Sequence, residues 1–266
     1  MAITHKLALI TGAADGIGLA TAQTLANEGW VIALLDLNGN LAKERAHKLG
    51  SQHSGWECDV TDASAVKQCV KNIHENYGHI DALVNNAGIG DQTVPTLQQD
   101  ISAFDRVLSV HLRGTFLMSQ HVIGFMANQD RDNKGVRGAI VNIGSIASLS
   151  GIPGRNAYCS AKAGVIGMTR ALATEWARQG IRVNAVSPGY VKTALVDKLA
   201  HQGAIDAKAI ARRTPLGRMA EPEEIAQSIS FLLSPHASYI TGATLPVDGG
   251  WTALGAPETA LEPLSI

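Results

Sequence analysis

Residues 7–18 read Leu-Ala-Leu-Ile-Thr-Gly-Ala-Ala-Asp-Gly-Ile-Gly, and they set the architecture of the chain. The apolar run Leu7–Ile10 predicts a short buried strand, and the pattern from Leu19 to Gly29 predicts an amphipathic helix. Glycines between a strand and a helix let the backbone approach a pyrophosphate, which the free N–H groups of the helix would bind. The spacing is Gly-x-x-x-Gly-x-Gly rather than Gly-x-Gly-x-x-Gly, so this segment alone indicates only a turn.

A second apolar run, Val31–Leu35, ends in Asp36, which lies 18 residues after Gly18. An acid about 20 residues beyond such a turn binds the 2′-hydroxyl of an adenosine ribose. Its carboxylate would repel a 2′-phosphate. No Arg or Lys occurs at positions 12–18 or 37–42 to neutralise one, and Asp15 adds negative charge. We therefore predict NAD rather than NADP, with a solvated acid at a strand end as the alternative.

Strands and helices continue to alternate along the chain. Further strands are predicted at 53–60, 80–84, 139–143, 181–186 and 244–247, and helices at 63–77, 101–126, 156–179 and 222–233, the last after a cap at Glu221. Seven β runs with helices between them predict a parallel sheet covered on both faces, in an α/β fold. Ligands bind beyond the carboxyl ends of the strands in such sheets.

Tyr158 and Lys162 lie four residues apart, so on a helix they share one face. An ammonium beside a phenol favours the phenolate, and we expect it to lower the pKa of Tyr158 from the usual value of about 10. Ser145, thirteen residues earlier, could hold a carbonyl or alcohol oxygen. The pattern indicates a site that moves a proton on or off an oxygen, although Tyr-x-x-x-Lys also occurs by chance in helices.

The composition narrows the function classes. A net charge of −1 gives no electrostatic reason to expect nucleic acid, and no apolar run approaches the ~20 residues of a membrane span. Cys58, Cys69 and Cys159 are widely spaced and form no metal-ligand pattern, so we expect no metal, reduced thiols and a cytoplasmic protein.

With these motifs in order, the chain resembles the short-chain dehydrogenase/reductase family from about residue 6 to 251. The motifs that carry the resemblance are Thr11–Gly18, Asp59–Val60, Asn85–Gly88, Ser145, Tyr158–Lys162, Asn184, Pro188–Gly189 with Thr193, and Asp248–Gly250. The resemblance implies a single Rossmann-type domain, residues 1–251, with strand order 3-2-1-4-5-6-7, followed by a tail at 252–266. It also implies an NAD(H)-dependent oxidoreductase that acts on a CH–OH group.

The resemblance assigns roles to individual residues. Tyr158 would be the general base in alcohol oxidation and the general acid in carbonyl reduction, Lys162 would lower its pKa and hold the nicotinamide ribose, and Ser145 would orient the substrate oxygen. The cofactor-binding residues that it implies are Gly12, Asp15, Gly16, Ile17, Gly18, Asp36, Asp59, Val60, Asn86, Ala87, Gly88, Tyr158, Lys162, Pro188, Gly189, Val191 and Thr193.

His111 stands where the family usually has Asn, a residue thought to hold a water that links the lysine to solvent. Imidazole can also donate and accept hydrogen bonds, but it is bulkier and titrates near pH 6.5. We expect either that His111 replaces the Asn in this relay, or that the relay is water-only and His111 merely packs in its helix.

Residues 193–220 would form the substrate loop. Its apolar side comprises Ala194, Leu195, Val196, Leu199, Ile205 and Ile210, and nearby polar candidates are Arg155 and Tyr190. We predict a small secondary alcohol, polyol or sugar as the substrate. Members of the family are commonly tetramers, so we expect a homotetramer, with the segment 256–266 either disordered or docked on a neighbouring subunit.

Two rival functions remain open at this point. A reductase of 3-oxoacyl esters on acyl carrier protein would share the fold and the three site residues, but it usually pairs with NADPH, against which Asp36 argues. A non-catalytic NAD-binding protein on the same fold is the other, and the intact Ser145, Tyr158 and Lys162 argue against it.

Overall fold

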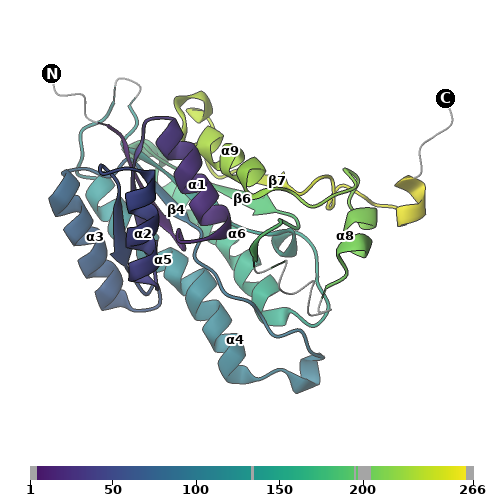
Figure 1. Ribbon diagram of the computed structural model, residues 1–266. Helices are drawn as coiled ribbons and strands as arrows, with labels where there is room; N and C mark the ends of the chain where they lie inside the picture. Colours follow the sequence, from purple (N-terminus) through teal and green to yellow (C-terminus); the bar gives the residue numbers. More distant parts are fainter. Residues whose placement is uncertain (1–4, 133–134, 195, 197–204, 262–266) are drawn as a thin grey trace.

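The computed structural model describes residues 5–132, 135–194, 196 and 205–261. The described residues form one parallel sheet in the order β3-β2-β1-β4-β5-β6-β7, which confirms the predicted fold class and strand order (Figure 1). Its strands are β1 (Leu7–Thr11), β2 (Val31–Asp36), β3 (Ser54–Glu57), β4 (Ala82–Asn85), β5 (Gly138–Ile143), β6 (Ile181–Pro188) and β7 (Thr244–Val247).

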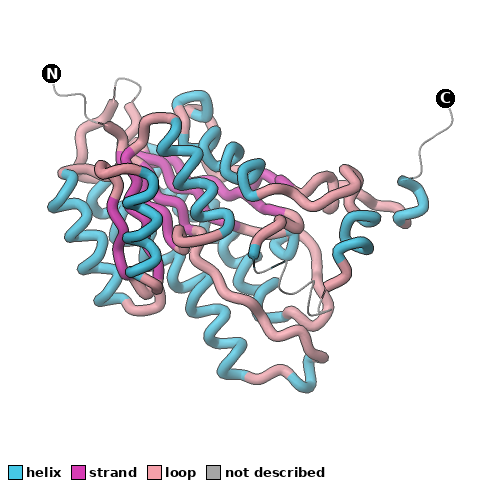
Figure 2. The backbone as a smooth tube through the Cα atoms, viewed as in Figure 1, coloured by secondary structure: helices cyan, strands magenta, loops and turns pink. Residues whose placement is uncertain are grey.

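Helices cover both faces of the sheet (Figure 2). One face carries α1 (Gly16–Asn27), α2 (Gly39–Leu49) and α9 (Pro222–Leu233), and the other carries α3 (Ala63–Tyr77), α5 (Gly114–Met126) and α6 (Asn156–Trp176). The remaining helices are α4 (Ile101–Leu108), which packs on α6, and α8 (Ala207–Arg213). None of the described helices is long and apolar enough to span a membrane.

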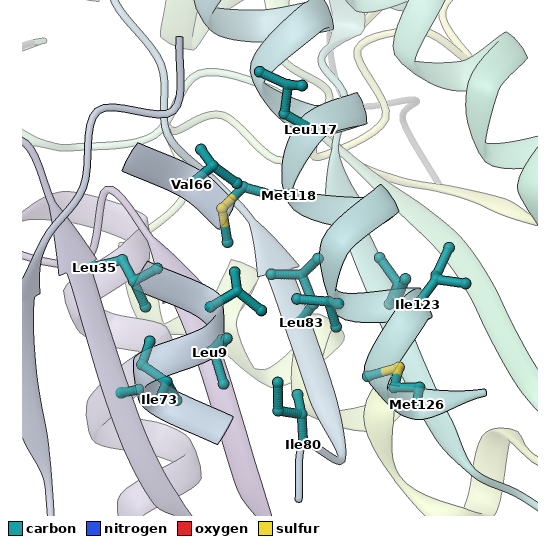
Figure 3. Packing of buried hydrophobic residues seen from close by; sticks show 14 of the residues in the cluster. Leu9, Leu35, Val66, Ile73, Ile80, Leu83, Leu117, Met118, Ile123 and Met126 are labelled. Atoms are coloured by element: carbon teal, nitrogen blue, oxygen red, sulfur yellow. The ribbon is translucent and has the colours of Figure 1, made fainter. Parts of the chain in front are cut away.

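The apolar runs of the sequence became central strands because both of their faces are buried. On one face, Leu9 and Leu83 of adjacent strands pack in the same cluster as Ile73 of α3 and Met118 of α5, and all four side chains are fully buried (Figure 3). Burial of each such side chain contributes about 1.5–3 kcal/mol. This packing fixes the position of the sheet, and the site lies at the carboxyl ends of its strands.

The third strand is shorter than predicted. The structure has a strand over Ser54–Glu57 rather than 53–60, and the chain turns after it. Asp59 causes the turn, because its Oδ1 accepts hydrogen bonds from the Thr61 amide at 2.8 Å and the Thr61 hydroxyl at 2.7 Å. An aspartate that bonds the amide two residues on favours a turn over a strand.

The helix predicted at 101–126 is interrupted. Between α4 and α5 the chain forms a π-helical segment, Ser109–Arg113, which contains His111. A π segment adds one residue to the turn, so it rotates the side chains that follow relative to a continuous α-helix. Such segments occur frequently at functional sites, which directs attention to His111.

A buried polar network attaches the helices to the centre of the sheet. The Asn85 amide nitrogen donates to Ser119 Oγ of α5 at 3.0 Å and to Asn142 Oδ1 of β5 at 2.8 Å. The Asn142 amide nitrogen in turn donates to Thr169 Oγ1 of α6 at 2.9 Å. Because a buried polar group that loses its partner is costly, these hydrogen bonds favour one position of α6 on the sheet.

Candidate active site

The glycine-rich turn joins β1 to α1 in the conformation that its glycines allow. Gly12 and Gly16 have φ of 61° and 56°, the left-handed region that residues with a Cβ rarely adopt. A Cβ on Gly18 would lie 2.2 Å from the Gly12 carbonyl oxygen, so the start of α1 approaches the turn closely. At the start of α1 the Gly16 amide donates to the Asp15 side chain at 2.7 Å, whereas the amides of Ile17 and Gly18 have no partner within the helix and could bind an anion.

The end of β4 is bound to this turn. The side-chain nitrogen Nδ2 of Asn86 donates to the carbonyl oxygens of Thr11 and Gly12, both at 3.0 Å. The Thr11 hydroxyl accepts hydrogen bonds from the backbone amides of Asn86 and Ala87, again at 3.0 Å. These bonds place two motifs that are far apart in the sequence on the same side of one cavity.

That cavity has a volume of about 600 Å³ and extends along the carboxyl edge of the sheet. The predicted site residues that line it are Gly12, Asp15, Gly16, Ile17, Asp36, Asn86, Gly88, His111, Ser145, Arg155, Tyr158, Lys162, Pro188, Gly189, Tyr190, Val191 and Thr193. Gly18, Asp59, Val60 and Ala87 are not part of its lining, and Leu195 and Leu199 lie outside the described residues.

Asp36 lies where β2 ends and accepts two backbone hydrogen bonds, from Ala14 at 3.1 Å and Asn38 at 3.0 Å. The carboxylate is thereby held against the glycine-rich turn. Arg45 of α2 reaches the same turn, because its Nε donates to the Ala14 carbonyl at 3.2 Å. Arg45 lies outside positions 12–18 and 37–42, the only positions considered in the sequence for a basic residue. The first turns of α2 bring it close to the glycine-rich turn.

Ser145 follows β5, and Tyr158 and Lys162 come from the first two turns of α6. Ser145 Oγ accepts the Ala147 amide at 3.1 Å, which leaves its own proton free to donate. Lys162 Nζ donates to the Ile143 carbonyl at 2.6 Å and lies 5.7 Å from the centroid of the Tyr158 ring. The three side chains therefore face one cavity.

The expected lowering of the Tyr158 pKa is not found. Burial raises the pKa of Tyr158, and hydrogen bonding to Ser145 and the charge of Arg155 offset only part of that increase. Burial also lowers the pKa of Lys162, to about 8. The sequence could show that the two side chains share a helix face, but not that Lys162 is buried and Tyr158 partly buried.

His111 is buried and neutral. Burial lowers its pKa to about 3, helped by the charge of Lys162 and opposed by hydrogen bonding to Ile89, so the expected titration near pH 6.5 is wrong for the folded protein. Nε2 lies 2.9 Å from the Ile89 carbonyl oxygen and 3.2 Å from its amide nitrogen, while the buried Nδ1 has no hydrogen-bond partner among the described residues. Its ring meets that of Tyr158 edge-on, with centroids 5.2 Å apart.

Gly88 provides the space for this imidazole. A Cβ at position 88 would lie 2.6 Å from His111 Cε1, closer than any real contact. The ring therefore packs against the backbone that follows β4, and its Nε2 is hydrogen-bonded to the backbone of Ile89. His111 positions this loop, which is a role that neither of the two sequence-based alternatives included.

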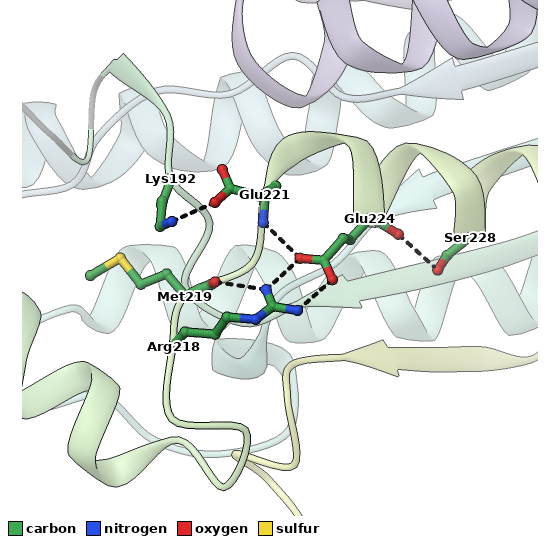
Figure 4. Close-up of polar contacts among 6 residues, drawn as sticks. All are labelled: Lys192, Arg218, Met219, Glu221, Glu224 and Ser228. Carbon is green, nitrogen blue, oxygen red and sulfur yellow. Dashed lines mark hydrogen bonds and ion pairs between the residues drawn. The ribbon is translucent and has the colours of Figure 1, made fainter.

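The two ends of the segment predicted to form the substrate loop lie together. The short bridge between Val191 and Ala220 brings its two ends together. Beside this bridge, Lys192 pairs with Glu221, and both terminal nitrogens of Arg218 donate to the Glu224 carboxylate at 2.7 Å (Figure 4). These exposed pairs join the end of the loop to the start of α9, where Glu221 is the cap residue as predicted.

The chain is similar to known proteins over most of its length. The model of a family described as enoyl-(acyl carrier protein) reductase matches residues 12–252. An uncharacterised short-chain type dehydrogenase/reductase of Sinorhizobium fredii is 41% identical over 95% of this chain, which spans 44% of that relative. This chain belongs to the short-chain dehydrogenase/reductase family.

Relatives of similar length are named for different activities. D-threitol dehydrogenase of Mycolicibacterium smegmatis is 41% identical and covered over 93% of each chain. A 3-oxoacyl-[acyl-carrier-protein] reductase of Thermotoga maritima is 39% identical over 94% of this chain and 99% of its own. The relatives therefore include a polyol dehydrogenase and a ketoacyl reductase, and they establish the reaction class without selecting the substrate.

Solved structures of the family agree in fold and differ in the cofactor they contain. A 3-ketoacyl-(acyl-carrier-protein) reductase from Brucella melitensis, complexed with NADH, has a TM-score of 0.85 at 32% identity and covers 93% of this chain and 98% of its own. The protein ElxO with NADP bound has a TM-score of 0.86 at 31% identity, over 94% and 100%. One member of the family has thus been solved with NADH and another with NADP.

The residues present fit such a cofactor. The amides of Ile17 and Gly18 at the start of α1 lie beside glycines that leave room for a pyrophosphate, and the Asp36 carboxylate lines the same cavity as an acceptor. No group of three His, Cys, Asp or Glu side chains suited to a metal ion occurs within the described ranges.

The sequence analysis missed several cavity residues that come directly after the Asn85–Gly88 motif. Ile89, Gly90, Asp91 and Thr93 all line the cavity. Their place after the end of β4, at the edge where ligands bind, was the available signal. Asp91 is the most informative of them, because it adds an acid close to Tyr158.

Replacement of His111 by Asn should make the stability of the protein less sensitive to acid. A buried neutral histidine binds a proton in the unfolded state near pH 6.5 but in the folded state only near pH 3, so stability falls as the pH drops through this window. Between pH 7 and 5 the wild type should lose about 2 kcal/mol more than His111→Asn. Urea unfolding at both pH values measures the difference.

The matched control is His47→Asn, which changes an exposed histidine on α2 and should leave the acid sensitivity as in the wild type. Equal losses in the wild type and His111→Asn would contradict the burial argument. In the same variant, an activity profile with an unchanged acid limb would count against a relay role for His111.

Proposed function

We propose that this short-chain dehydrogenase/reductase uses NAD(H) to interconvert a small secondary alcohol, polyol or sugar and its carbonyl form. The observation that carries the proposal is the common cavity, which is lined by Ser145, Tyr158 and Lys162 as well as by the glycine-rich turn and Asp36. A nicotinamide bound there would supply the hydride acceptor or donor, and the protein would supply position and proton transfer.

Tyr158 would transfer the proton. Its raised pKa keeps the hydroxyl protonated near neutral pH, which suits donation to the oxygen of a carbonyl under reduction. In the opposite direction the phenolate would take the proton of the alcohol, so Tyr158 would first have to release its own proton to solvent. Ser145, whose oxygen already accepts the Ala147 amide, would donate its proton to the same substrate oxygen and hold it in place.

Lys162 would hold the cofactor ribose. One of its three donors is used on the Ile143 carbonyl, so two remain for the ribose hydroxyls. The pyrophosphate would lie on Gly12, Asp15, Gly16, Ile17 and Gly18, the adenosine near Asp36, Asp59, Val60, Asn86, Ala87 and Gly88, and the carboxamide near Pro188, Gly189, Val191 and Thr193. Arg155, Tyr190 and Leu195 remain our substrate-side residues.

Assembly and location extend the proposal. A homotetramer is supported by an apolar surface groove formed by Leu108, Leu112, Phe116 and Met168, which lie on α4, the π segment, α5 and α6. A solution mass of a single chain would contradict it. The three cysteines are free, in keeping with a cytoplasmic protein.

Reduction of 3-oxoacyl esters on acyl carrier protein is the second candidate, favoured by the similarity to a Thermotoga maritima reductase of that name. Asp36 opposes it to the extent that such an enzyme uses NADPH. A non-catalytic NAD-binding protein is disfavoured, because Ser145, Tyr158 and Lys162 line the cavity together.

The proposed function predicts the outcome of a substrate screen. Purified protein should reduce NAD⁺ with at least one member of a panel of secondary alcohols, polyols and sugars, and the same member should be oxidised far more slowly with NADP⁺. Absorbance at the nicotinamide band follows both reactions. Faster oxidation of NADPH or NADH by a 3-oxoacyl thioester than by the carbonyl form of any member of the panel would support the second candidate instead.

Cofactor choice should depend on the balance between Asp36 and Arg45. Asp36→Asn keeps an acceptor for the backbone amides but removes the charge that would repel a 2′-phosphate, while Arg45 remains beside the turn. The ratio of kcat/KM for NADP⁺ over NAD⁺ should rise about tenfold to a hundredfold, since one repulsive charge pair near a protein surface costs a few kcal/mol.

Arg45→Met in the Asp36→Asn background is the informative second variant. It should reverse most of the gain, because the remaining positive charge near the 2′ position is lost. An unchanged cofactor ratio in Asp36→Asn would show that Asp36 does not face the ribose.

A further inference from the structure

One carboxylate oxygen of Asp91 accepts a hydrogen bond from the protein, and the other has no partner among the described residues. The loop after β4 carries it into the cavity, where Oδ2 accepts the backbone amide of Tyr158 at 3.1 Å. That amide belongs to the first turn of α6 and has no partner within the helix. Oδ1 is enclosed and has no hydrogen-bond partner in the described part of the chain.

Arg155, beside the Tyr158 ring, presents a complementary case. It precedes α6, lines the cavity, and holds its guanidinium carbon 4.8 Å from the centroid of the Tyr158 ring. Its Nε is also enclosed without a hydrogen-bond partner among the described residues. The charge of Arg155 lowers the pKa of Tyr158 and the charge of Asp91 raises it.

An enclosed acceptor and an enclosed donor without partners are costly in a folded protein and require an explanation. A ligand that satisfied both would have to donate to Asp91 and accept from Arg155. A hydroxyl group does both. A carboxylate or phosphate would pair with Arg155 but be repelled by Asp91. An ammonium would pair with Asp91 but be repelled by Arg155. An acyl chain would form a hydrogen bond with neither.

We propose that Asp91 and Arg155 form a second hydroxyl subsite, and that the substrate is a diol or polyol whose non-reacting hydroxyl binds there while its neighbour faces Tyr158 and Ser145. The inference rests on the proposed function and narrows it to substrates that carry a second hydroxyl beside the reacting one. Asp91 also gains its position from His111, whose Nε2 holds the backbone of Ile89 two residues earlier in the same loop.

The test compares butane-2,3-diol with butan-2-ol as substrates for NAD⁺ reduction. The wild type should prefer the diol in kcat/KM by about tenfold or more, because the second hydroxyl gains charge-assisted hydrogen bonds. Asp91→Ala should reduce this preference about tenfold to a hundredfold. Asp91→Asn, which retains an acceptor without the charge, should reduce it less, and Arg155→Met should also reduce it.

The matched control is Asp62→Ala. Asp62 caps α3 by accepting the amides of Ser64 and Ala65, at 2.8 and 3.1 Å, and it does not line the cavity. This variant loses a helix cap as Asp91→Ala does, yet it should leave the preference for the diol unchanged. A preference that moves equally in both variants would assign the effect to helix capping and overturn the inference.

The two proposals fail in different ways. Oxidation of both compounds without preference, or a preference that survives Asp91→Ala and Arg155→Met, would overturn the second hydroxyl subsite while the dehydrogenase function stands. If the whole panel of alcohols, polyols and sugars fails to reduce NAD⁺, the proposed function fails, and the subsite that depends on it fails with it.

Discussion

Two buried amide side chains, Asn85 and Asn142, connect the centre of the sheet to the helices that cover it. They link Ser119 of α5 to Thr169 of α6 through hydrogen bonds of 2.8–3.0 Å. Because α6 carries Tyr158 and Lys162, this network determines where the phenol and the ammonium lie relative to the strand ends. A shift of α6 would leave buried polar groups unpaired, so the position is strongly enforced.

A second set of contacts places the loop that faces α6. The π segment orients the His111 ring into the space that Gly88 leaves, and the ring holds the Ile89 backbone. Asp91 follows two residues later and accepts the Tyr158 amide. Through these contacts a residue that differs from the usual family pattern shapes the substrate side of the cavity, in addition to any part in proton transfer.

Much of the fold could be predicted from the sequence, because apolar runs such as Val31–Leu35 are buried on both faces and must be central strands. The turn at Asp59 and the π segment at His111 were missed, since each depends on local hydrogen bonds that the apolar pattern does not reveal. The pKa values of Tyr158 and His111 were predicted wrongly because burial sets them. Arg45 was missed because only the folded chain brings α2 to the turn.

The most direct measurement is the turnover of Tyr158→Phe on the substrate that the wild type oxidises best, together with its binding of NADH. The substitution removes one hydroxyl and keeps the ring that packs against His111 and Arg155. Proton transfer by a positioned side chain contributes about 10²–10⁴-fold to a rate, so kcat should fall by that factor while NADH binding remains measurable. Full turnover in this variant would contradict the proposed chemistry.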